Sequence, residues 1–205
     1  MKTRAAHAAG ADVCEEVVYR PYFPFNTLKC VGVPLYRSQS ARDYACLLDL
    51  DPEVLGWQCF TNLFADDTID RKFTIDFIVE TKHDCTMVEI WEKSPGDTFW
   101  VRDAATRAGY SYQAVCMPEI RKQPRLQNAK DLIRYAGYDA PLGDRIRLSA
   151  ALGDMGSMTL AECLVAVRDG RPMQTMAALI LQGHVEVDLD EALLGSDTIV
   201  RLPRR

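Results

Sequence analysis

Apolar and polar residues alternate most regularly in one stretch near the middle of the chain. In Lys72–Glu80, every second position is apolar, and a period of two places these side chains on one face of a strand. The four apolar positions are Phe73, Ile75, Phe77 and Val79. Cys85–Lys93 is predicted to be the next strand, with Met87, Glu89, Trp91 and Lys93 on one face. Thr81–Asp84 separates the two stretches and predicts a turn, so the strands are expected to form a hairpin.

Helical periodicity and capping residues predict the elements on either side of this hairpin. Ser40 can act as the N-cap of a helix, with Asp43 as the return half of a capping box, and Asp51-Pro52 ends that helix. Gly109 is suited to the position after another helix C-terminus. The further elements predicted here are strands at Val54–Phe60 and Tyr112–Met117 and helices at Phe99–Ala108 and Leu126–Tyr135.

The last third of the chain predicts a smaller unit. Short helices are expected at Thr159–Val167 and Pro172–Gln182, followed by strands at His184–Leu189 and Thr198–Leu202. Two helices followed by a two-stranded ribbon resemble a small winged-helix module. The expected division is an irregular lead-in (1–38), an α/β domain (39–136), a linker (137–147) and this module (148–205).

Composition indicates an ordinary globular protein and argues against a membrane protein or a zinc protein. The 205 residues are 48% hydrophobic and 26% charged, as in ordinary globular proteins. No apolar run approaches the ~18 residues that span a bilayer, so no membrane partner is expected. The seven cysteines include no CxxC pair, which argues against a zinc site and suggests buried thiols in a reducing cytoplasm.

The net charge is −5, but positive charge is concentrated in one stretch. Between Arg121 and Arg147, seven bases stand against three acids. Such a strip can contact a phosphate backbone, or it can be the solvated face of a helix. In the winged-helix interpretation, Gln174 and Thr175 at the start of a helix would approach a DNA groove. The residues expected to contact DNA are Arg121, Lys122, Arg125, Lys130, Arg168 and Arg171.

Two acidic residues of the predicted hairpin are the strongest candidates for chemistry. A symmetric turn at Thr81–Asp84 pairs residues whose numbers sum to 165, so Asp76 and Glu89 would face each other, with Cβ atoms roughly 4.5–5.5 Å apart. Like charges this close oppose folding unless a cation or a shared proton compensates. Hard oxygen ligands suit Mg²⁺ or Mn²⁺. The alternative is that the carboxylates point into solvent or pair with Lys72 or Lys93.

Several stretches occur in a specific order and spacing. They are Ser-Ala-Arg-Asp-Tyr-Ala-Cys-Leu-Leu-Asp-Leu-Asp-Pro at 40–52, Phe-Thr-Ile-Asp-Phe-Ile-Val-Glu at 73–80, Met-Val-Glu-Ile-Trp at 87–91, Ala-Gly-Tyr-Ser-Tyr-Gln-Ala-Val at 108–115 and Glu-Ile at 119–120. Together with the ending Gly-His-Val-Glu-Val-Asp-Leu-Asp and Thr-Ile-Val, they resemble the TnsA-type endonuclease subunit of heteromeric transposases. That family belongs to the PD-(D/E)xK restriction-endonuclease-like superfamily, and the resemblance covers roughly 40–202.

The resemblance implies a restriction-endonuclease-like core, with a mixed central sheet flanked by helices, followed by the small module. It also implies a metal-dependent site, in which Asp76 and Glu89 hold the metal beside a glutamate of the first helix and a lysine two residues after Glu89. Ala41 stands at the glutamate position and Trp91 at the lysine position, so the site is expected to be degenerate. Lys93 is the remaining candidate for the catalytic lysine.

Three functions are compatible with these residues. The first is a DNA-transposition protein that is impaired in cutting and acts by binding DNA, a transposase or a transposition regulator. The second is an active Mg²⁺-dependent endonuclease that cuts transposon ends with rearranged catalytic residues. The third is a DNA-binding regulatory adaptor with no link to transposition. A shared fold does not decide among them.

Overall fold

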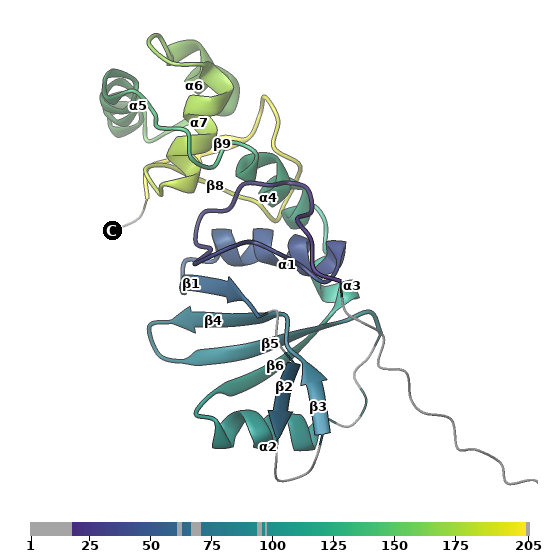
Figure 1. The fold of residues 1–205 in the computed structure, drawn as a ribbon. Helices are drawn as coiled ribbons and strands as arrows, with labels where there is room; N and C mark the ends of the chain where they lie inside the picture. Colours follow the sequence, from purple (N-terminus) through teal and green to yellow (C-terminus); the bar gives the residue numbers. More distant parts are fainter. Residues whose placement is uncertain (1–17, 61–62, 67–70, 94–95, 97, 204–205) are drawn as a thin grey trace, which may run out of the picture.

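A four-stranded mixed sheet organises the first two-thirds of the chain in the computed structural model, which describes residues 18–60, 63–66, 71–93, 96 and 98–203, with the backbone alone at 63–66 and 71–72. The strand order is β1 (Val54–Cys59), β4 (Phe77–Thr81), β5 (Cys85–Trp91) and β6 (Ser111–Cys116). β1, β4 and β5 pair antiparallel, whereas β6 runs parallel to β5 after the crossover helix α2 (Phe99–Arg107). The expected α/β fold with a mixed sheet flanked by helices is confirmed (Figure 1).

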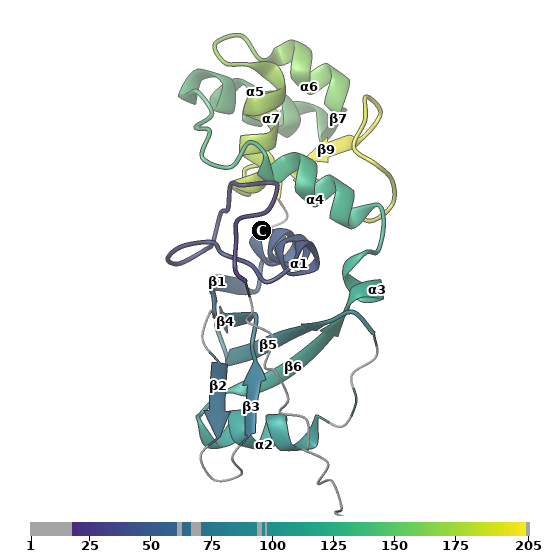
Figure 2. The ribbon, with the colours of Figure 1, turned by 45° about the vertical axis from the view of Figure 1, so that its right-hand side comes forward.

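The two faces of the sheet bury separate apolar cores, which hold one helix each. Helix α1 (Gln39–Leu50) lies over one face and α2 lies at the other (Figure 2). The core beneath α1 includes Ala41, Ala45, Leu48, Trp57, Phe77, Val79, Val88 and Ile90. The core beneath α2 includes Phe73, Ile75, Met87, Val101, Ala105 and Tyr112. Burial of each large aliphatic or aromatic side chain contributes roughly 1.5–3 kcal/mol, so the helices are fixed mainly by packing.

The first helix begins earlier than its sequence pattern suggested. Ser38, not Ser40, is the N-cap, and its hydroxyl accepts a hydrogen bond from the Ala41 N–H. The proposed capping role of Asp43 is wrong, because its carboxylate accepts from Lys130 and Gln39 instead. An acid buried on α1 is thus stabilised by a cation from a distant helix and not by its own helix terminus.

The irregular lead-in is fixed to α1 by buried charged groups. Arg42 is fully buried and donates to the carbonyl oxygens of Pro24 and Asn26. Asp49 accepts from the Lys29 N–H and the Trp57 indole. These contacts add to the backbone bridge between Cys30 and Trp57, and together they hold the lead-in against α1 and β1.

The central hairpin has the predicted register as far as Phe77 and Val88, where the pairing stops short of the predicted Asp76–Glu89 pair. Phe77 pairs with Val88, Ile78 with Met87, Val79 with Thr86 and Glu80 with Cys85, so each pair sums to 165. In the turn, the Thr81 hydroxyl accepts from the His83 and Asp84 N–H groups. This local bonding closes a turn that lacks the favoured Asn-Gly sequence.

The predicted strand Lys72–Glu80 is interrupted at Ile75–Asp76. Its first part, β3 (Arg71–Thr74), pairs with β2 (Leu63–Asp66) in a separate two-stranded sheet, and β2 was not predicted. The expected single apolar face is therefore wrong: Phe73 lies in the core beneath α2 and Phe77 in the core beneath α1. The alternating pattern predicted burial correctly at both positions. It cannot predict that the two halves of the stretch pair with different strands.

The chain leaves β6 through a short helix that the sequence pattern did not reveal, α3 (Met117–Ile120), and then forms α4 (Arg125–Ile133). α4 packs across α1, and Lys130 bridges the two helices through its ion pair with Asp43 at 2.8 Å. Gly109 has φ 85°, as expected for the residue after a helix C-terminus.

The last part of the chain contains three helices and a three-stranded antiparallel sheet. The elements are α5 (Leu142–Met155), β7 (Ser157–Thr159), α6 (Leu160–Ala166), α7 (Pro172–Leu181), β8 (Glu186–Val187) and β9 (Ile199–Arg201), with the sheet order β7-β9-β8. The expected two helices and two strands were too few. α5 begins inside the range predicted as a linker, and β7 is a strand too short to show alternation. The capping box of Thr159 and Glu162 is confirmed.

Helix α4 joins the two parts of the molecule (Figures 1 and 2). It packs against α7, and the fully buried Asn128 donates to the carbonyl oxygens of Leu189 and Ala192 and accepts from the Leu194 N–H. The segment between β8 and β9 is therefore held against α4, which in turn packs on α1. Across the described ranges, no helix is both long and apolar enough to cross a membrane.

Candidate functional site

Asp76 lies where the chain passes from β3 to β4, and its carboxylate is bound by an arginine. The Arg37 guanidinium donates to both carboxylate oxygens, at 3.1 Å from Nε and 2.7 Å from Nη2. The Ile90 N–H donates to the same carboxylate at 2.7 Å, and Arg37 also donates to the Ile90 carbonyl at 2.9 Å. Only 5% of the Asp76 surface is exposed, so this is a buried, bidentate ion pair.

The position of β4 explains why this pair forms. Pairing with β5 stops at Phe77 and Val88, so the next part of β5 lacks a continuing neighbour strand on that side. Arg37 and Asp76 together satisfy both backbone groups of Ile90. The ion pair thus completes the hydrogen bonding of a buried strand, which is a structural task.

Burial raises the pKa of Asp76, while the Arg37 guanidinium and the Ile90 N–H oppose part of that rise. For Arg37, burial acts against the charged form, but the hydrogen bonds to Asp76 outweigh it and raise the pKa of the guanidinium. Arg37 therefore supplies the positive charge that the two neighbouring acids, Asp76 and Glu89, were predicted to require.

Glu89 is half-buried on β5 and accepts a 2.7 Å hydrogen bond from the Tyr112 hydroxyl of β6. Burial raises the pKa of Glu89, Tyr112, Trp91 and Arg37 lower it, and the charge of Asp76 raises it. The two acids of the predicted pair are thus electrostatically coupled. Each has its own hydrogen-bond donor, and Arg37 lies within electrostatic reach of both.

Trp91 ends β5 beside Cys116 of β6, at the position where the resemblance expects a lysine. Its indole N–H is buried and makes no well-formed hydrogen bond among the described residues, but it lies close enough to Glu89 to lower the pKa of that acid. Lys93 lies in the bend after β5 and is exposed. The expectation that Lys93 shares a strand face with Glu89 is therefore wrong, because the strand ends two residues before it.

Ala41 is 1% exposed and packs in the core beneath α1. Its methyl group offers no ligand. Across the described ranges, no group of three or more His, Cys, Asp or Glu residues lies together in a way that could hold a metal ion. Since Asp76 already accepts from Arg37 and Ile90, the residues present do not fit the Mg²⁺ or Mn²⁺ site that the resemblance implies.

Sequence comparison does not name a family. No protein-family model matches the chain, and no curated protein matches it. The resemblance to TnsA-type endonucleases therefore rests on the short sequence stretches alone.

The basic strip of 121–147 is largely engaged inside the molecule. Four of its seven bases form ion pairs: Arg125 with Asp190, Lys130 with Asp43, Arg134 with Asp131, and Arg147 with both Asp144 and Asp169. A continuous phosphate-binding strip is therefore not formed. The candidate DNA-contacting residues with exposed side chains are Arg121, Lys122, Arg168 and Arg171.

The start of α7 lacks the exposed polar side chains that the winged-helix interpretation predicted for it. Thr175 is fully buried, and its hydroxyl has no hydrogen-bond partner among the described residues. Gln174 is half-buried. Helix α7 packs on α6 and on α4, so its sides contact protein. The expectation that Thr175 approaches DNA is corrected by this packing. Arg201 is exposed on β9, whereas Arg204 and Arg205, further bases at the chain end, lie outside the described residues.

Sequence reasoning missed Arg37 and Asp144, the two residues that organise the buried charges. Asp144 accepts from the N–H groups of Arg168, Asp169 and Gly170 and from the Arg147 guanidinium. No motif marks Arg37. The signal that could have found it is physical: an aspartate in a strand of buried residues needs a cation, and an arginine lies immediately before the helix that covers this sheet.

Proposed function

We propose that this chain is a nuclease-fold protein of a DNA-transposition system that does not cut DNA and acts by binding partner proteins. The observation that supports this most directly is the Arg37–Asp76 ion pair. The Arg37 guanidinium and the Ile90 N–H occupy most of the acceptor sites of the Asp76 carboxylate, and the guanidinium already supplies the positive charge that a divalent ion would bring. Ala41 and Trp91 remove the two other contributions that such a site needs, a ligand and a positive charge.

The order of elements supports the nuclease fold. Without the β2–β3 insertion, the chain runs α1-β1-β4-β5-α2-β6, which is a helix, three antiparallel strands, a helix and a parallel strand. This agrees with the restriction-endonuclease-like core that the resemblance implies. The later order of helix, strand, two helices and two strands supports the winged-helix interpretation of the module.

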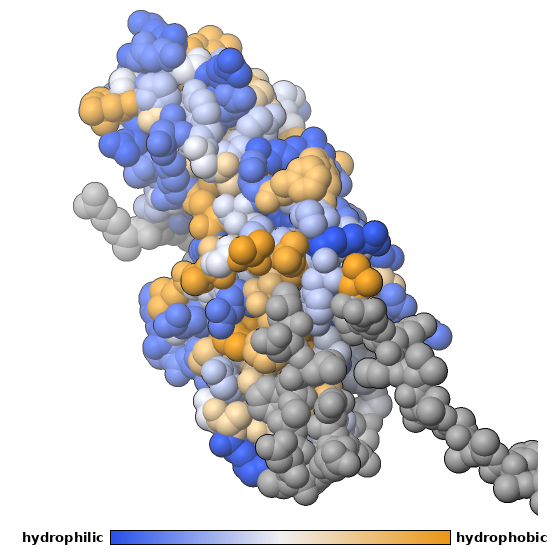
Figure 3. Space-filling view, in the orientation of Figure 1, coloured by the Kyte–Doolittle hydropathy of each residue, from blue (hydrophilic) through white to orange (hydrophobic). Residues whose placement is uncertain are grey.

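An exposed apolar surface supports a protein partner. The lead-in and β1 expose large apolar side chains: Phe25 66%, Val31 64%, Val33 71% and Leu55 53%. Figure 3 shows apolar side chains gathered at mid-height of this face, where the lead-in, α1 and β1 lie in Figure 1. Contiguous exposed apolar patches are typical of protein–protein interaction sites. A transposase or its regulator is the partner class that the resemblance suggests.

DNA is proposed as a secondary partner, contacted through the exposed Arg121, Lys122, Arg168 and Arg171. Binding through so few phosphate contacts is expected to be weak and sensitive to salt. The cysteines among the described residues carry free thiols, which supports the reducing cytoplasm as the place of action.

The decisive experiment combines a plasmid-nicking assay with calorimetric titration of Mn²⁺. The unmodified chain is expected to leave supercoiled DNA uncut with Mg²⁺ or Mn²⁺. Arg37→Met should free Asp76 and raise Mn²⁺ affinity at least tenfold without producing cutting. Arg20→Met is the matched control, since Arg20 is an exposed arginine of the same lead-in whose guanidinium contacts Tyr22.

Metal-dependent cutting by the unmodified chain, abolished by Asp76→Ala, would refute the proposal. Equal Mn²⁺ affinity in Arg37→Met and Arg20→Met would remove the support for an inherited metal site. A transposase gene beside the gene for this chain would favour transposition over an unrelated regulatory role.

A further inference from the structure

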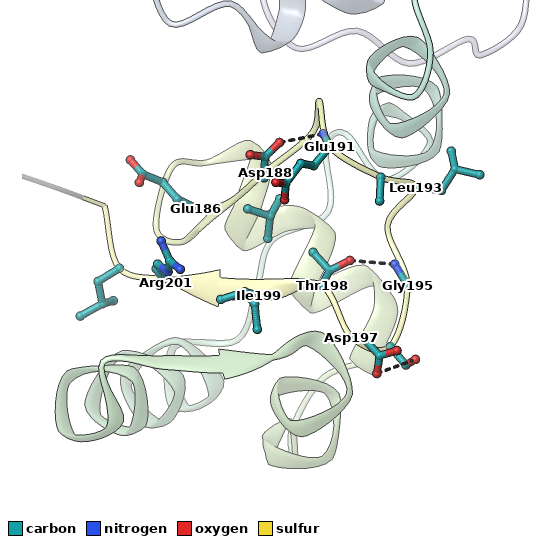
Figure 4. Close-up of a pocket in the computed structure, with 13 residues that line it drawn as sticks. Glu186, Asp188, Glu191, Leu193, Gly195, Asp197, Thr198, Ile199 and Arg201 are labelled. Atoms are coloured by element: carbon teal, nitrogen blue, oxygen red, sulfur yellow. Dashed lines mark hydrogen bonds between the residues drawn. The ribbon is translucent and has the colours of Figure 1, made fainter.

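A cavity lies in the C-terminal module, between β8 and β9. These strands pair through only two residue pairs, Glu186 with Arg201 and Val187 with Val200. The chain then turns away from the sheet through 188–198 and returns to β9. The space enclosed by this detour is an open groove of about 880 Å³ (Figure 4).

The lining of this groove combines apolar and acidic side chains. Leu193 and Ile199 are 60% and 42% exposed, beside the half-buried Val187 and Leu202. Four acids line it, Glu186, Asp188, Glu191 and Asp197, against a single base, Arg201. Arg201 pairs across the strands with Glu186. A surface with this balance repels phosphate and attracts lysine and arginine.

The groove is held in shape before anything binds. Asp188 accepts from the N–H groups of Asp190 and Glu191, and Gly195 donates to the Thr198 hydroxyl. Asn128 of α4 anchors the same segment through three hydrogen bonds, and Arg125 pairs with Asp190. A preformed site loses little conformational entropy on binding, which favours an occupant that is itself extended and flexible.

We propose that this groove binds a short segment of a partner protein that carries lysine or arginine beside apolar side chains. The apolar side chains would cover Leu193 and Ile199, and the cations would lie against Glu191 and Asp197. This inference rests on the proposed function in one respect, that the chain works through protein partners. It assigns to the 188–198 segment the opposite role from a DNA-contacting wing, since its charge has the wrong sign for phosphate.

The test uses the full chain and a fluorescein-labelled ten-residue peptide in which lysine and leucine alternate. Fluorescence anisotropy measures its affinity, and the same peptide with glutamate in place of lysine is the control probe. Two double variants alter exposed groove residues: Glu191→Lys with Asp197→Lys, and Leu193→Ser with Ile199→Ser. Matched controls are Asp154→Lys and Val165→Ser, which change an exposed acid and an exposed apolar residue of the same module outside the groove.

Each groove variant is expected to weaken lysine–leucine binding at least tenfold, while each control stays within twofold. Amide hydrogen exchange of the unmodified chain should show peptide-dependent protection within 186–202, which tests the site without any substitution. Equal binding by groove variants and controls, or protection of 186–202 by a DNA duplex and not by the peptide, overturns the inference. Metal-dependent DNA cutting would overturn the proposed function and leave the groove assignment intact.

Discussion

Asp76 lies beside the four-stranded sheet, and Asp144 lies in the first turn of α5. Both side chains are buried, and each accepts hydrogen bonds from an arginine. Their pKa values nevertheless move in opposite directions. For Asp144, burial favours the neutral acid, but three backbone N–H groups and Arg147 outweigh it and lower the pKa to about 2. For Asp76, burial prevails over Arg37 and the single Ile90 N–H, and the pKa is raised.

The difference reflects depth as well as donors: the Asp76 carboxylate lies deep in the protein, whereas the Asp144 carboxylate lies close to the surface, where desolvation opposes its charge only weakly. The negative charge of Asp144 is balanced by the hydrogen bonds that it accepts, and these bonds fix the turn at 168–170 against the start of α5. Asp76 is compensated mainly by one side chain, so its charge depends on Arg37.

The largest expected effect is from Asp144→Ala. Removing the carboxylate leaves the three N–H groups of the 168–170 turn without their acceptor, so the protein should lose about 3 kcal/mol of unfolding free energy. Urea unfolding followed by circular dichroism measures the loss. Asp154→Ala, at an exposed position of the same helix, should change stability by less than about 0.5 kcal/mol. Similar values for the two variants would contradict the role given to Asp144.

A smaller loss, about 2 kcal/mol, is expected from Arg37→Met, because Asp76 then remains buried without its cation. Replacing both partners, Arg37→Met with Asp76→Leu, should recover part of this loss, since no unpaired charge is left. Chemical denaturation of the parent, of Arg37→Met, of Asp76→Leu and of the double variant measures both effects. A double variant as unstable as the sum of its single variants would show that the pair is not coupled.

The pH dependence of stability should have opposite signs at the two acids. Asp144 has a folded pKa near 2, below its ordinary value of 3.8, so its contribution is present above pH 3.8 and is lost as the pH falls toward 2. Asp76 has a raised folded pKa, so its contribution is largest at low pH and declines as the pH rises above 3.8. Stability curves of Asp144→Asn and Asp76→Asn against pH check this. Changes of the same sign in both variants would remove the contrast.

The smallest effect is expected from Lys93→Ala. Lys93 is exposed beyond the end of β5, so its removal should alter stability by less than about 0.5 kcal/mol and leave the Arg37–Asp76 pair unchanged. Thermal unfolding and the Mn²⁺ titration measure this. A large change in metal affinity would restore Lys93 as a candidate catalytic residue.

The local patterns of the sequence determined the elements whose causes are themselves local. Alternation and the Thr81–Asp84 turn were sufficient to predict the register of the β4–β5 hairpin, because a turn fixes which residues face each other. The capping box at Thr159 and Glu162 and the glycine after α2 were also predictable, since both depend on neighbours within a few residues.

Only the tertiary structure decided the partners of the buried charges. Arg37 and Asp76 are separated by 39 residues, and Lys130 and Asp43 by 87, so no periodicity links them. The change of partner strand at Asp76, the short strand β7 and the burial of Thr175 against neighbouring helices have the same origin. A buried ion pair is selected by which elements pack together, and that packing depends on the whole chain.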